Sequence, residues 1–389
     1  MAAQIPRPFK LERFFAKYEF QSPYLLCCSD CEALTLQELL AAADEDSLSR
    51  WSDLKLSYTE SQGLPALREA IAALYEKVTP EQLVVCVPEE GVYLAMRVLL
   101  QPGDKVVATY PGYQSLHELA ATCGCSISHW EPKPAAGSAG AAGSGGLEFN
   151  IEEARALIQP GTKLVVVNFP HNPTGATLSI GNWAALIRHC REVGAWLFSD
   201  EMYKFTELPP SAPLPAAADV YERGVSLCGL SKSWGLPGLR LGWLACQDSQ
   251  LLQQVLALKD YTTICSPATS EVLALAAVRA TPKLTQRCRD IIATNLAAAD
   301  AFFARWTDVF EWHRPQGGPI AFPRLTTGED VEQWCEQLVN ESGVLLLPAG
   351  VYDHEPSVRR GHFRVGLGRQ NLPQCLEQLE AWLVKKYRS

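Results

Sequence analysis

The chain contains 389 residues, of which 47% are hydrophobic and 20% are charged, as expected for a globular protein with a sizeable buried core. Its formal net charge of −9 and the absence of a basic cluster argue against nucleic acid as its main partner. The sequence has neither an N-terminal apolar leader nor a stretch of about 18 apolar residues. We therefore expect a cytoplasmic protein that does not act at a membrane.

The 13 cysteines are expected to be mostly reduced in such a compartment and to pack as small apolar side chains. Cys28 and Cys31 have a C-x-x-C spacing, and Cys123 and Cys125 form a second close pair. Neither pair is accompanied by another at zinc spacing, and the histidines show no ligand pattern. We therefore predict no metal site.

Helical and strand patterns alternate from about residue 64 to residue 246. Helical spacing occurs over residues 64–78, 91–100 and 114–122, and short apolar runs occur over residues 83–87, 105–110, 164–169, 195–199, 225–229 and 240–244. These runs are continuously apolar, which predicts strands that are covered on both faces. We therefore expect a largely parallel sheet covered by helices, that is, an α/β fold.

The remainder of the chain predicts a smaller α+β domain. Helical patterns cover residues 271–280, 284–306 and 372–387, and strand patterns cover 318–322, 344–347 and 362–366. We place the large domain at residues 51–281 and the small domain at 282–389, joined by the N-terminal segment 1–50. Residues 134–146 are rich in glycine, alanine and serine, which predicts a flexible surface loop without a catalytic role.

Lys232 and Arg240 form an unusual pair of cations, because they lie eight positions apart between apolar runs interrupted by glycine. A buried lysine tends to lose its charge, and a neutral amine is the nucleophile that forms a Schiff base. An arginine can hold a phosphate through its planar fork of donors. An amine beside a phosphate anchor is what pyridoxal phosphate requires from a protein.

Further polar and aromatic side chains follow other predicted strands. Asn172 lies in an Asn-Pro-Thr-Gly turn, Asp200 and Tyr203 follow the strand at 195–199, and Tyr113 follows the strand at 105–110. Ligands of an open α/β sheet bind at the carboxyl ends of its strands, so we expect these side chains to gather near Lys232. His171 lies inside the same turn as Asn172, and we interpret it as structural.

The order of these motifs resembles that of the class I/II aminotransferases, which are fold type I pyridoxal-phosphate enzymes. Asn-Pro-Thr-Gly at 172–175 is followed by Asp-x-x-Tyr at 200–203 and by Ser-Lys at 231–232, with Arg240 beyond it. The resemblance covers nearly the whole chain. It implies that the large domain binds pyridoxal phosphate and that residues 1–50 cap the active site.

The resemblance implies a role for each residue around the cofactor ring. Lys232 would form the Schiff base and later move the Cα proton of the substrate. Asp200 would pair with the ring nitrogen, so that the ring can accept electrons. Tyr203 and Asn172 would bind the 3-oxygen of the ring, and Tyr113 would stack on its face.

The resemblance also implies how the phosphate is held. Ser231 and Arg240 would bind it, with help from the backbone at the helix start that contains Glu89 and Glu90. Tyr58 matches the tyrosine that the family donates to the phosphate of the neighbouring subunit, which implies a homodimer with shared sites.

Two departures from the family pattern concern the phosphate. Gly229 stands three positions before the lysine, where a serine is common, so one hydroxyl is lost from the phosphate site. A carboxylate facing a phosphate is unfavourable, so we expect Glu89 to point toward the substrate side or toward solvent.

The substrate side contains further acids and one arginine. The resemblance implies that Arg364 binds the α-carboxylate of an amino-acid substrate. The segment at 259–268 lacks an arginine for a distal acid, which argues against a dedicated aspartate or glutamate enzyme. Glu12, Asp30 and Glu32 resemble the acids of the capreomycidine-synthase-like branch, which cyclises a hydroxylated arginine. Alternatively, these acids belong to a charged, solvated helix face.

Two reaction outcomes therefore stay open. After removal of the Cα proton, the enzyme either transaminates an α-amino acid, or eliminates a hydroxyl group and cyclises a substrate similar to arginine. Transamination is the broader expectation, and the N-terminal acids favour the second outcome. A cofactor-binding regulator or inactive scaffold is a third interpretation, which the intact Lys232 and Asp200 disfavour.

Overall fold

The computed structural model describes residues 5–135, 146–352 and 361–388. Its centre is a seven-stranded sheet in the order β2 (Leu83–Cys86), β10 (Gly242–Cys246), β9 (Gly224–Gly229), β8 (Trp196–Asp200), β7 (Thr162–Asn168), β3 (Lys105–Thr109) and β4 (Ser126–Trp130). Only β10 runs antiparallel to its neighbours in this sheet. The mainly parallel sheet expected from the sequence is thus confirmed.

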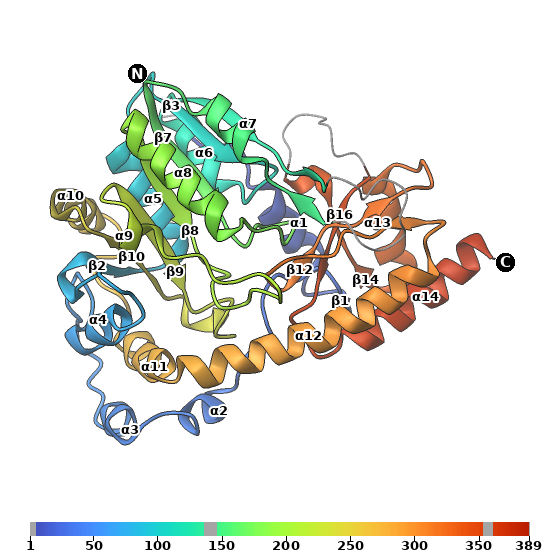
Figure 1. The fold of residues 1–389 in the computed structure, drawn as a ribbon. Helices are drawn as coiled ribbons and strands as arrows, with labels where there is room; N and C mark the ends of the chain where they lie inside the picture. The colour runs from blue at the N-terminus through green and yellow to red at the C-terminus, as the bar shows by residue number, and fades with distance from the viewer. Residues whose placement is uncertain (1–4, 136–145, 353–360, 389) are drawn as a thin grey trace.

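Helices cover both faces of this sheet because successive strand residues point to opposite sides. On one face, α5 (Pro88–Leu99), α6 (Ser115–Thr122) and α10 (Ser249–Lys259) pack against one alternating set of strand residues. On the other face lie α4 (Pro65–Ala72) and α11 (Ala268–Arg279), and beside them α7 (Ile151–Leu157) and α8 (Ile180–Val193). Figure 1 shows the sheet between these layers.

The chain leaves the sheet through the long helix α12 (Thr281–Arg305), which runs toward the C-terminal part alongside α14 (Leu372–Tyr387) (Figure 1). The other elements there are α13 (Val331–Ser342) and the strands β11 (Phe310–Glu311), β12 (Ile320–Ala321), β13 (Arg324–Leu325), β14 (Val344–Leu345), β15 (Leu347–Pro348) and β16 (Phe363–Gly366). The helices and strands share one core of buried aromatic and aliphatic side chains.

The N-terminal segment packs against this C-terminal part. Strand β1 (Tyr24–Leu25) pairs in parallel with β14, and the core around Leu11 of α1 (Lys10–Tyr18) includes residues of β14 and β15. The short helices α2 (Leu36–Leu40) and α3 (Glu45–Ser52) then lead to the sheet, and α9 (Ala217–Val220) precedes β9. Residues 136–145 of the loop predicted at 134–146 lie outside the described residues, and β5 (Lys133–Pro134) pairs with β6 (Leu147–Glu148) at its two ends.

Several elements differ from the sequence expectation. Strand β4 was not predicted, because it is an edge strand whose exposed serines and histidine interrupt the apolar pattern. The helix expected over 64–78 ends at Ala72, and the last strand of the sheet begins at Gly242 instead of Arg240. Arg240 has a left-handed φ of 48°, which a strand cannot contain.

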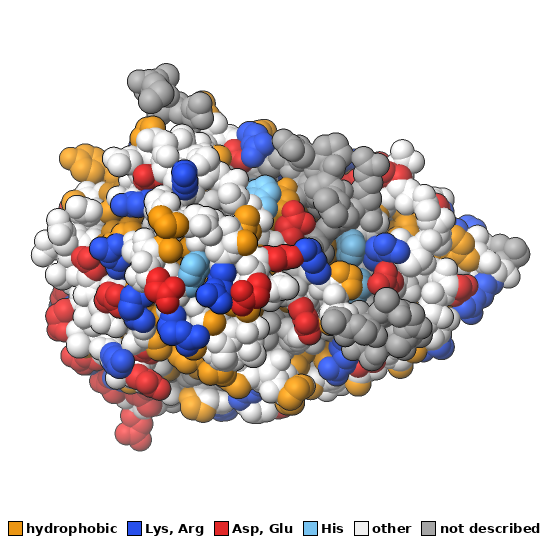
Figure 2. All heavy atoms as spheres, turned by 45° about the horizontal axis from the view of Figure 1, so that its top comes forward, with side chains coloured by type: hydrophobic (Ala, Val, Ile, Leu, Met, Phe, Trp, Pro, Cys, Tyr) orange, Lys and Arg blue, Asp and Glu red, His pale blue; other side chains and the backbone are white. Residues whose placement is uncertain are grey.

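The surface shows no dominant charge on the face seen in Figure 2, where basic and acidic side chains of the described residues alternate. Within residues 5–135, 146–352 and 361–388, no helix is both long and apolar enough to cross a bilayer.

Candidate active site

The ends of strands β7 and β8 carry the first part of the site. Asn168 and Asp200 are neighbours in register, and the Asn168 side-chain amide donates to the Asp200 carbonyl at 3.0 Å. The Asn168 amide oxygen accepts from the backbone N–H of Asn172 at 2.7 Å. These bonds hold the Asn-Pro-Thr-Gly turn against the end of β8, and they bring Asn172 and Asp200 to the same edge of the sheet.

Asp200 is a buried acid with an unusual proton affinity. Its side chain is 6% exposed, and burial raises its pKa from 3.8 to about 7. The backbone N–H of Met202 donates to Asp200 Oδ1 at 3.0 Å and lowers the pKa, whereas the charges of Glu89 and Glu201 raise it further. A cation placed against Asp200 would stabilise the carboxylate, so the position favours a positively charged partner.

The raised pKa predicts that Asp200 makes the protein without cofactor less stable as the pH rises. Because its folded-state pKa is above the unfolded value, its contribution to stability is complete below pH 3.8 and is lost as the pH rises through about 7. Between pH 5 and pH 8, the free energy of unfolding of the wild type should fall by about 2–3 kcal/mol more than that of Asp200→Asn. Denaturant unfolding at both pH values measures this difference, and equal falls would contradict the shift.

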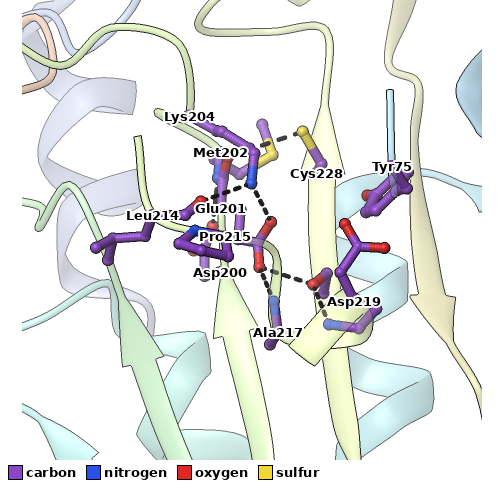
Figure 3. Close-up of polar contacts among 12 residues, drawn as sticks. Tyr75, Asp200, Glu201, Met202, Lys204, Leu214, Pro215, Ala217, Asp219 and Cys228 are labelled. Atoms are coloured by element: carbon purple, nitrogen blue, oxygen red, sulfur yellow. Dashed lines mark hydrogen bonds and ion pairs between the residues drawn. The ribbon is translucent and has the colours of Figure 1, made fainter. Parts of the chain in front are cut away.

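The next residue, Glu201, turns away into a separate buried network. Its Oε1 accepts from Ser226 Oγ at 2.7 Å and from the Ala217 N–H at 2.9 Å, and its Oε2 lies 3.5 Å from Lys204 Nζ (Figure 3). The Glu201 carboxylate is therefore engaged by neighbouring strands and loops, whereas the side chain of Asp200 makes only the bond to Met202 among the described residues.

Lys232 follows β9 and reaches the N-terminal segment. Its Nζ donates to Ser29 Oγ at 2.9 Å. Burial lowers the pKa of the lysine amine, and the nearby charge of Asp30 partly opposes the shift. The structure thus favours the neutral amine that a nucleophile requires. Ser29 was missed by the sequence interpretation, because nothing in the sequence indicates a contact across two hundred positions.

Tyr203 and the Lys232 amine share Ser29 as a partner. Tyr203 is 3% exposed, burial raises its pKa, and Arg364 and a hydrogen bond with Ser29 oppose the shift. The phenol therefore stays protonated at neutral pH and can donate a hydrogen bond.

Ser231, Gly229 and Arg240 lie where the phosphate is expected. Ser231 Oγ is buried and has no hydrogen-bond partner among the described residues. A Cβ at Gly229 would lie 2.8 Å from Pro88 Cγ, so the approach of the α5 start excludes the serine that is common there. Arg240 is exposed, makes one bond of 3.5 Å with a carbonyl, and lowers the pKa of Glu89 by its charge.

The two acids at the start of α5 face different neighbours. Glu89 accepts from Ser115 Oγ at 3.2 Å, and burial raises its pKa. Glu90 instead accepts from the hydroxyl groups of Thr262 and Thr263, the second at 2.8 Å. We expected both residues to contribute backbone N–H groups to the phosphate, and the Glu90 side chain bonds the loop after α10. Only the backbone of Glu90 is left for an anion.

Arg364 is the most deeply buried cation of the site. It lies on β16 and is 1% exposed. Its Nε donates to the Cys27 carbonyl at 2.8 Å, and its Nη1 donates to Asn172 Oδ1 at 3.2 Å and to the Tyr352 hydroxyl at 2.7 Å. These bonds join the C-terminal part to the Asn172 turn of the sheet. Tyr352 was another residue missed by the sequence interpretation.

The N-terminal segment lies against Tyr113. The rings of Phe9 and Tyr113 have centroids 5.0 Å apart and are tilted by 53°. Arg7 forms an ion pair of 2.7 Å with Glu118 on α6. At the other end of α1, Lys17 pairs with Glu336 on α13 at 3.1 Å. The segment is thus anchored to both the sheet part and the C-terminal part.

The N-terminal acids do not form one group. Asp30 is paired with Arg369 at 3.0 Å, and Glu32 accepts from the Gln370 N–H at 3.0 Å. Glu12 is exposed. The pKa values of Glu89, Tyr113 and Glu19 are raised mainly by the burial of these three groups, and the charge of Glu12 adds a smaller contribution to each. Of the three acids proposed for a substrate cation, Glu12 is therefore the one without an ion-pair or hydrogen-bond partner among the described residues.

Tyr58 is not brought to the site within this chain. It is 91% exposed in the single chain. The remaining predicted residues converge from separate elements: Asn172, Asp200 and Tyr203 from β7 and β8, Ser231 and Lys232 from β9, and Arg364 from β16.

A lysine amine with a lowered pKa and a buried aspartic acid after the strands of a mainly parallel α/β sheet, with a buried arginine from β16, indicate a pyridoxal-phosphate enzyme of fold type I. A family model described as aminotransferase class I and II matches residues 24–378, and the chain belongs to this family. The resemblance inferred from the motifs is thus confirmed, and the cofactor of this family is pyridoxal phosphate.

Individual relatives include both transaminases and cyclising enzymes. Capreomycidine synthase from Streptomyces vinaceus is 33% identical over 309 residues, which cover 77% of this chain and 75% of that protein. Arginine–pyruvate transaminase AruH from Pseudomonas aeruginosa is 29% identical, over 80% of this chain and 77% of that protein. The structure of the PLP-dependent cyclase OrfR is 27% identical with a TM-score of 0.86, over 99% of this chain and 100% of that chain. The chain is therefore a PLP-dependent aminotransferase or a related cyclase.

The residues present fit this cofactor. The orphaned Ser231 hydroxyl and the nearly unbonded Arg240 guanidinium are donors suited to a phosphate. Asp200, with its raised pKa, suits a protonated ring nitrogen, and the Lys232 amine suits an aldehyde carbon.

Proposed function

We propose that this enzyme is an aminotransferase that acts on an α-amino acid, with Lys232 as its catalytic base and nucleophile. The observation that carries this proposal is the Lys232 amine, which bonds Ser29 at 2.9 Å, has a pKa lowered by burial, and acts electrostatically with the buried Asp200 and Arg364. Asp200 is the group for the cofactor ring in this arrangement, and Arg364 is the group for a substrate carboxylate.

Each side chain then has one task. Pyridoxal phosphate, when bound, supplies an aldehyde that condenses with amines and a ring that accepts the electrons released at Cα. Asp200 keeps a proton on the ring nitrogen, and Tyr203 and Asn172 bind the 3-oxygen. Arg364 holds the substrate carboxylate and thereby orients the Cα–H bond toward Lys232 Nζ, which takes the proton.

A second function is favoured by the acids at the N-terminal side of the site. Burial raises the pKa of Glu89, and the charge of Glu12 adds to this shift, so a cationic substrate side chain would be favourable beside these acids. Two relatives, capreomycidine synthase and arginine–pyruvate transaminase, are named for reactions of this kind of substrate or its products. In the cyclising outcome, the Cα proton and a side-chain hydroxyl leave as water. A guanidinium nitrogen then bonds the carbon that carried the hydroxyl, and the proton that this nitrogen loses is balanced by a proton returned to Cα.

Product analysis separates the two functions. The holoenzyme is incubated with arginine, hydroxyarginine or a neutral amino acid, each with and without pyruvate, and products are followed by mass spectrometry. A 2-oxo acid that forms only with pyruvate supports transamination. A cyclic product that forms without an acceptor supports cyclisation, and the absence of any product would contradict both functions.

We infer a homodimer in which Tyr58 of each copy reaches the phosphate of the other. Support comes from the exposed apolar side chains near Tyr58 and the α10–α11 loop, namely Leu56, Tyr261 and Ile264, which are 83%, 89% and 50% exposed in the single chain. A dimer interface would cover such a surface.

Tyr58→Phe is therefore expected to weaken cofactor binding by about 10-fold or more, because a hydrogen bond to a charged phosphate is lost. Fluorescence titration of the cofactor-free protein measures this change, and sedimentation velocity establishes the dimer. Tyr261→Phe is the matched control, since it removes another exposed hydroxyl of the same surface. Equal affinities of the two variants, or a monomeric protein, would contradict the shared site.

A further inference from the structure

The hydroxyl group of Tyr352 forms hydrogen bonds with both Asn172 and Arg364. Tyr352 follows the short 3-10 turn at Ala349–Val351 and is 2% exposed. Its hydroxyl donates to Asn172 Oδ1 at 3.0 Å and accepts from Arg364 Nη1 at 2.7 Å. Arg364 Nη1 also donates to Asn172 Oδ1 at 3.2 Å, so the three side chains form a closed triangle.

This triangle determines which way the Asn172 amide faces. An amide oxygen only accepts hydrogen bonds and an amide nitrogen only donates them. Since two donors converge on Oδ1, the Nδ2 group of Asn172 must face the opposite way, where it has no acceptor among the described residues. Nδ2 is therefore available to the ring oxygen of the cofactor.

The same triangle determines which part of Arg364 is free. Nε is used by the Cys27 carbonyl and Nη1 by Tyr352 and Asn172, whereas Nη2 makes no hydrogen bond with a described residue. Arg364 thus has Nη2 available to a carboxylate, while its other two nitrogens are held in place by their hydrogen bonds. Tyr352 remains a protonated phenol at neutral pH, because burial raises its pKa.

We propose that Tyr352 is a positioning residue, whose hydroxyl couples the Arg364 carboxylate site to the orientation of Asn172 at the cofactor. This inference rests on the proposed function. Phenylalanine at this position would leave Arg364 Nη1 with one acceptor and Asn172 Oδ1 with one donor. Both residues are buried, so bulk solvent does not readily replace the hydrogen bonds of the lost hydroxyl.

The test is a spectral titration of the cofactor-loaded Tyr352→Phe variant with two pairs of probes. L-Arginine is compared with agmatine, and L-alanine with ethylamine; the two members of each pair differ only in the α-carboxylate. We expect the Kd of the amino acids to rise about 3- to 10-fold, while the Kd of the amines changes less than about twofold.

Tyr221→Phe is the matched control, because the Tyr221 hydroxyl is also buried but donates to the Ala195 carbonyl before β8, at 2.6 Å. If Tyr352→Phe only destabilised the protein, its Kd values would match those of Tyr221→Phe. Thermal unfolding followed by circular dichroism measures the stability of both variants. Equal weakening of amino acids and amines, or an amino-acid Kd equal to that of Tyr221→Phe, would overturn the role of Tyr352. A wild-type holoenzyme that shows no shift with either amino acid would contradict the proposed function, and this inference with it.

Discussion

Replacing Lys232 with alanine is expected to abolish the visible absorbance that the wild type acquires with pyridoxal phosphate and to lower kcat by at least about 10³-fold. The reason is that the variant lacks both the amine that bonds the aldehyde and the base that takes the Cα proton. No other described lysine contacts Ser29, so none can substitute for it. An absorbance scan of the loaded protein and a single-turnover assay measure the two effects.

Lys163→Ala is the matched control for this experiment. Lys163 is a half-buried lysine on β7, at the end of the strand away from Asn168. The control should keep both the absorbance and the activity. A Lys232→Ala protein with an unchanged band would contradict the assignment of the nucleophile and would favour the interpretation as a cofactor-binding scaffold.

The second large effect is expected for Asp200→Asn, which should lower kcat by about 10²- to 10³-fold. An amide has no negative charge, so it cannot keep a proton on the ring nitrogen, and the ring then accepts electrons from Cα less readily. Because the side chains have similar size and Asp200 is buried, we expect little change in the fold. Steady-state kinetics and a Cα-proton exchange assay on the holoenzyme measure the loss.

Glu201→Gln separates this effect from a general loss of buried charge. Glu201 is adjacent in sequence and equally buried, but its carboxylate is bonded to Ser226, Ala217 and Lys204 (Figure 3). Its replacement should reduce stability and leave Cα-proton exchange within about threefold of the wild type. Similar losses of exchange in the two variants would contradict the special role of Asp200.

The residues proposed to bind the cofactor could be identified in the sequence because they lie in short motifs at the ends of strands. Asn172, Asp200 and Lys232 follow continuously apolar runs, and the carboxyl ends of parallel strands meet at one edge of a sheet. The burial of these strands also made the fold predictable. Edge strand β4 was missed for the opposite reason, since its solvent face is polar.

Contacts that span the chain could not be predicted. Ser29 and Tyr352 have no motif of their own, and they become part of the site only because the N-terminal segment and the C-terminal strands fold against the sheet. In the same way, Asp30 was expected to be available to a substrate cation, but it is paired with Arg369. The partners of the Glu90 side chain, Thr262 and Thr263, could not be predicted either, because they lie in a loop that is distant in sequence.

The sequence by itself determined the α/β class, the cofactor and the lysine proposed to bind it, because each depends on residue types at fixed spacing along neighbouring strands. The tertiary structure alone decided how Arg364 is oriented and which of the acids keeps an unpaired carboxylate. These properties depend on partners that are distant in sequence, and on the loss of solvent when the N-terminal segment and the C-terminal strands close around Lys232 and Asp200.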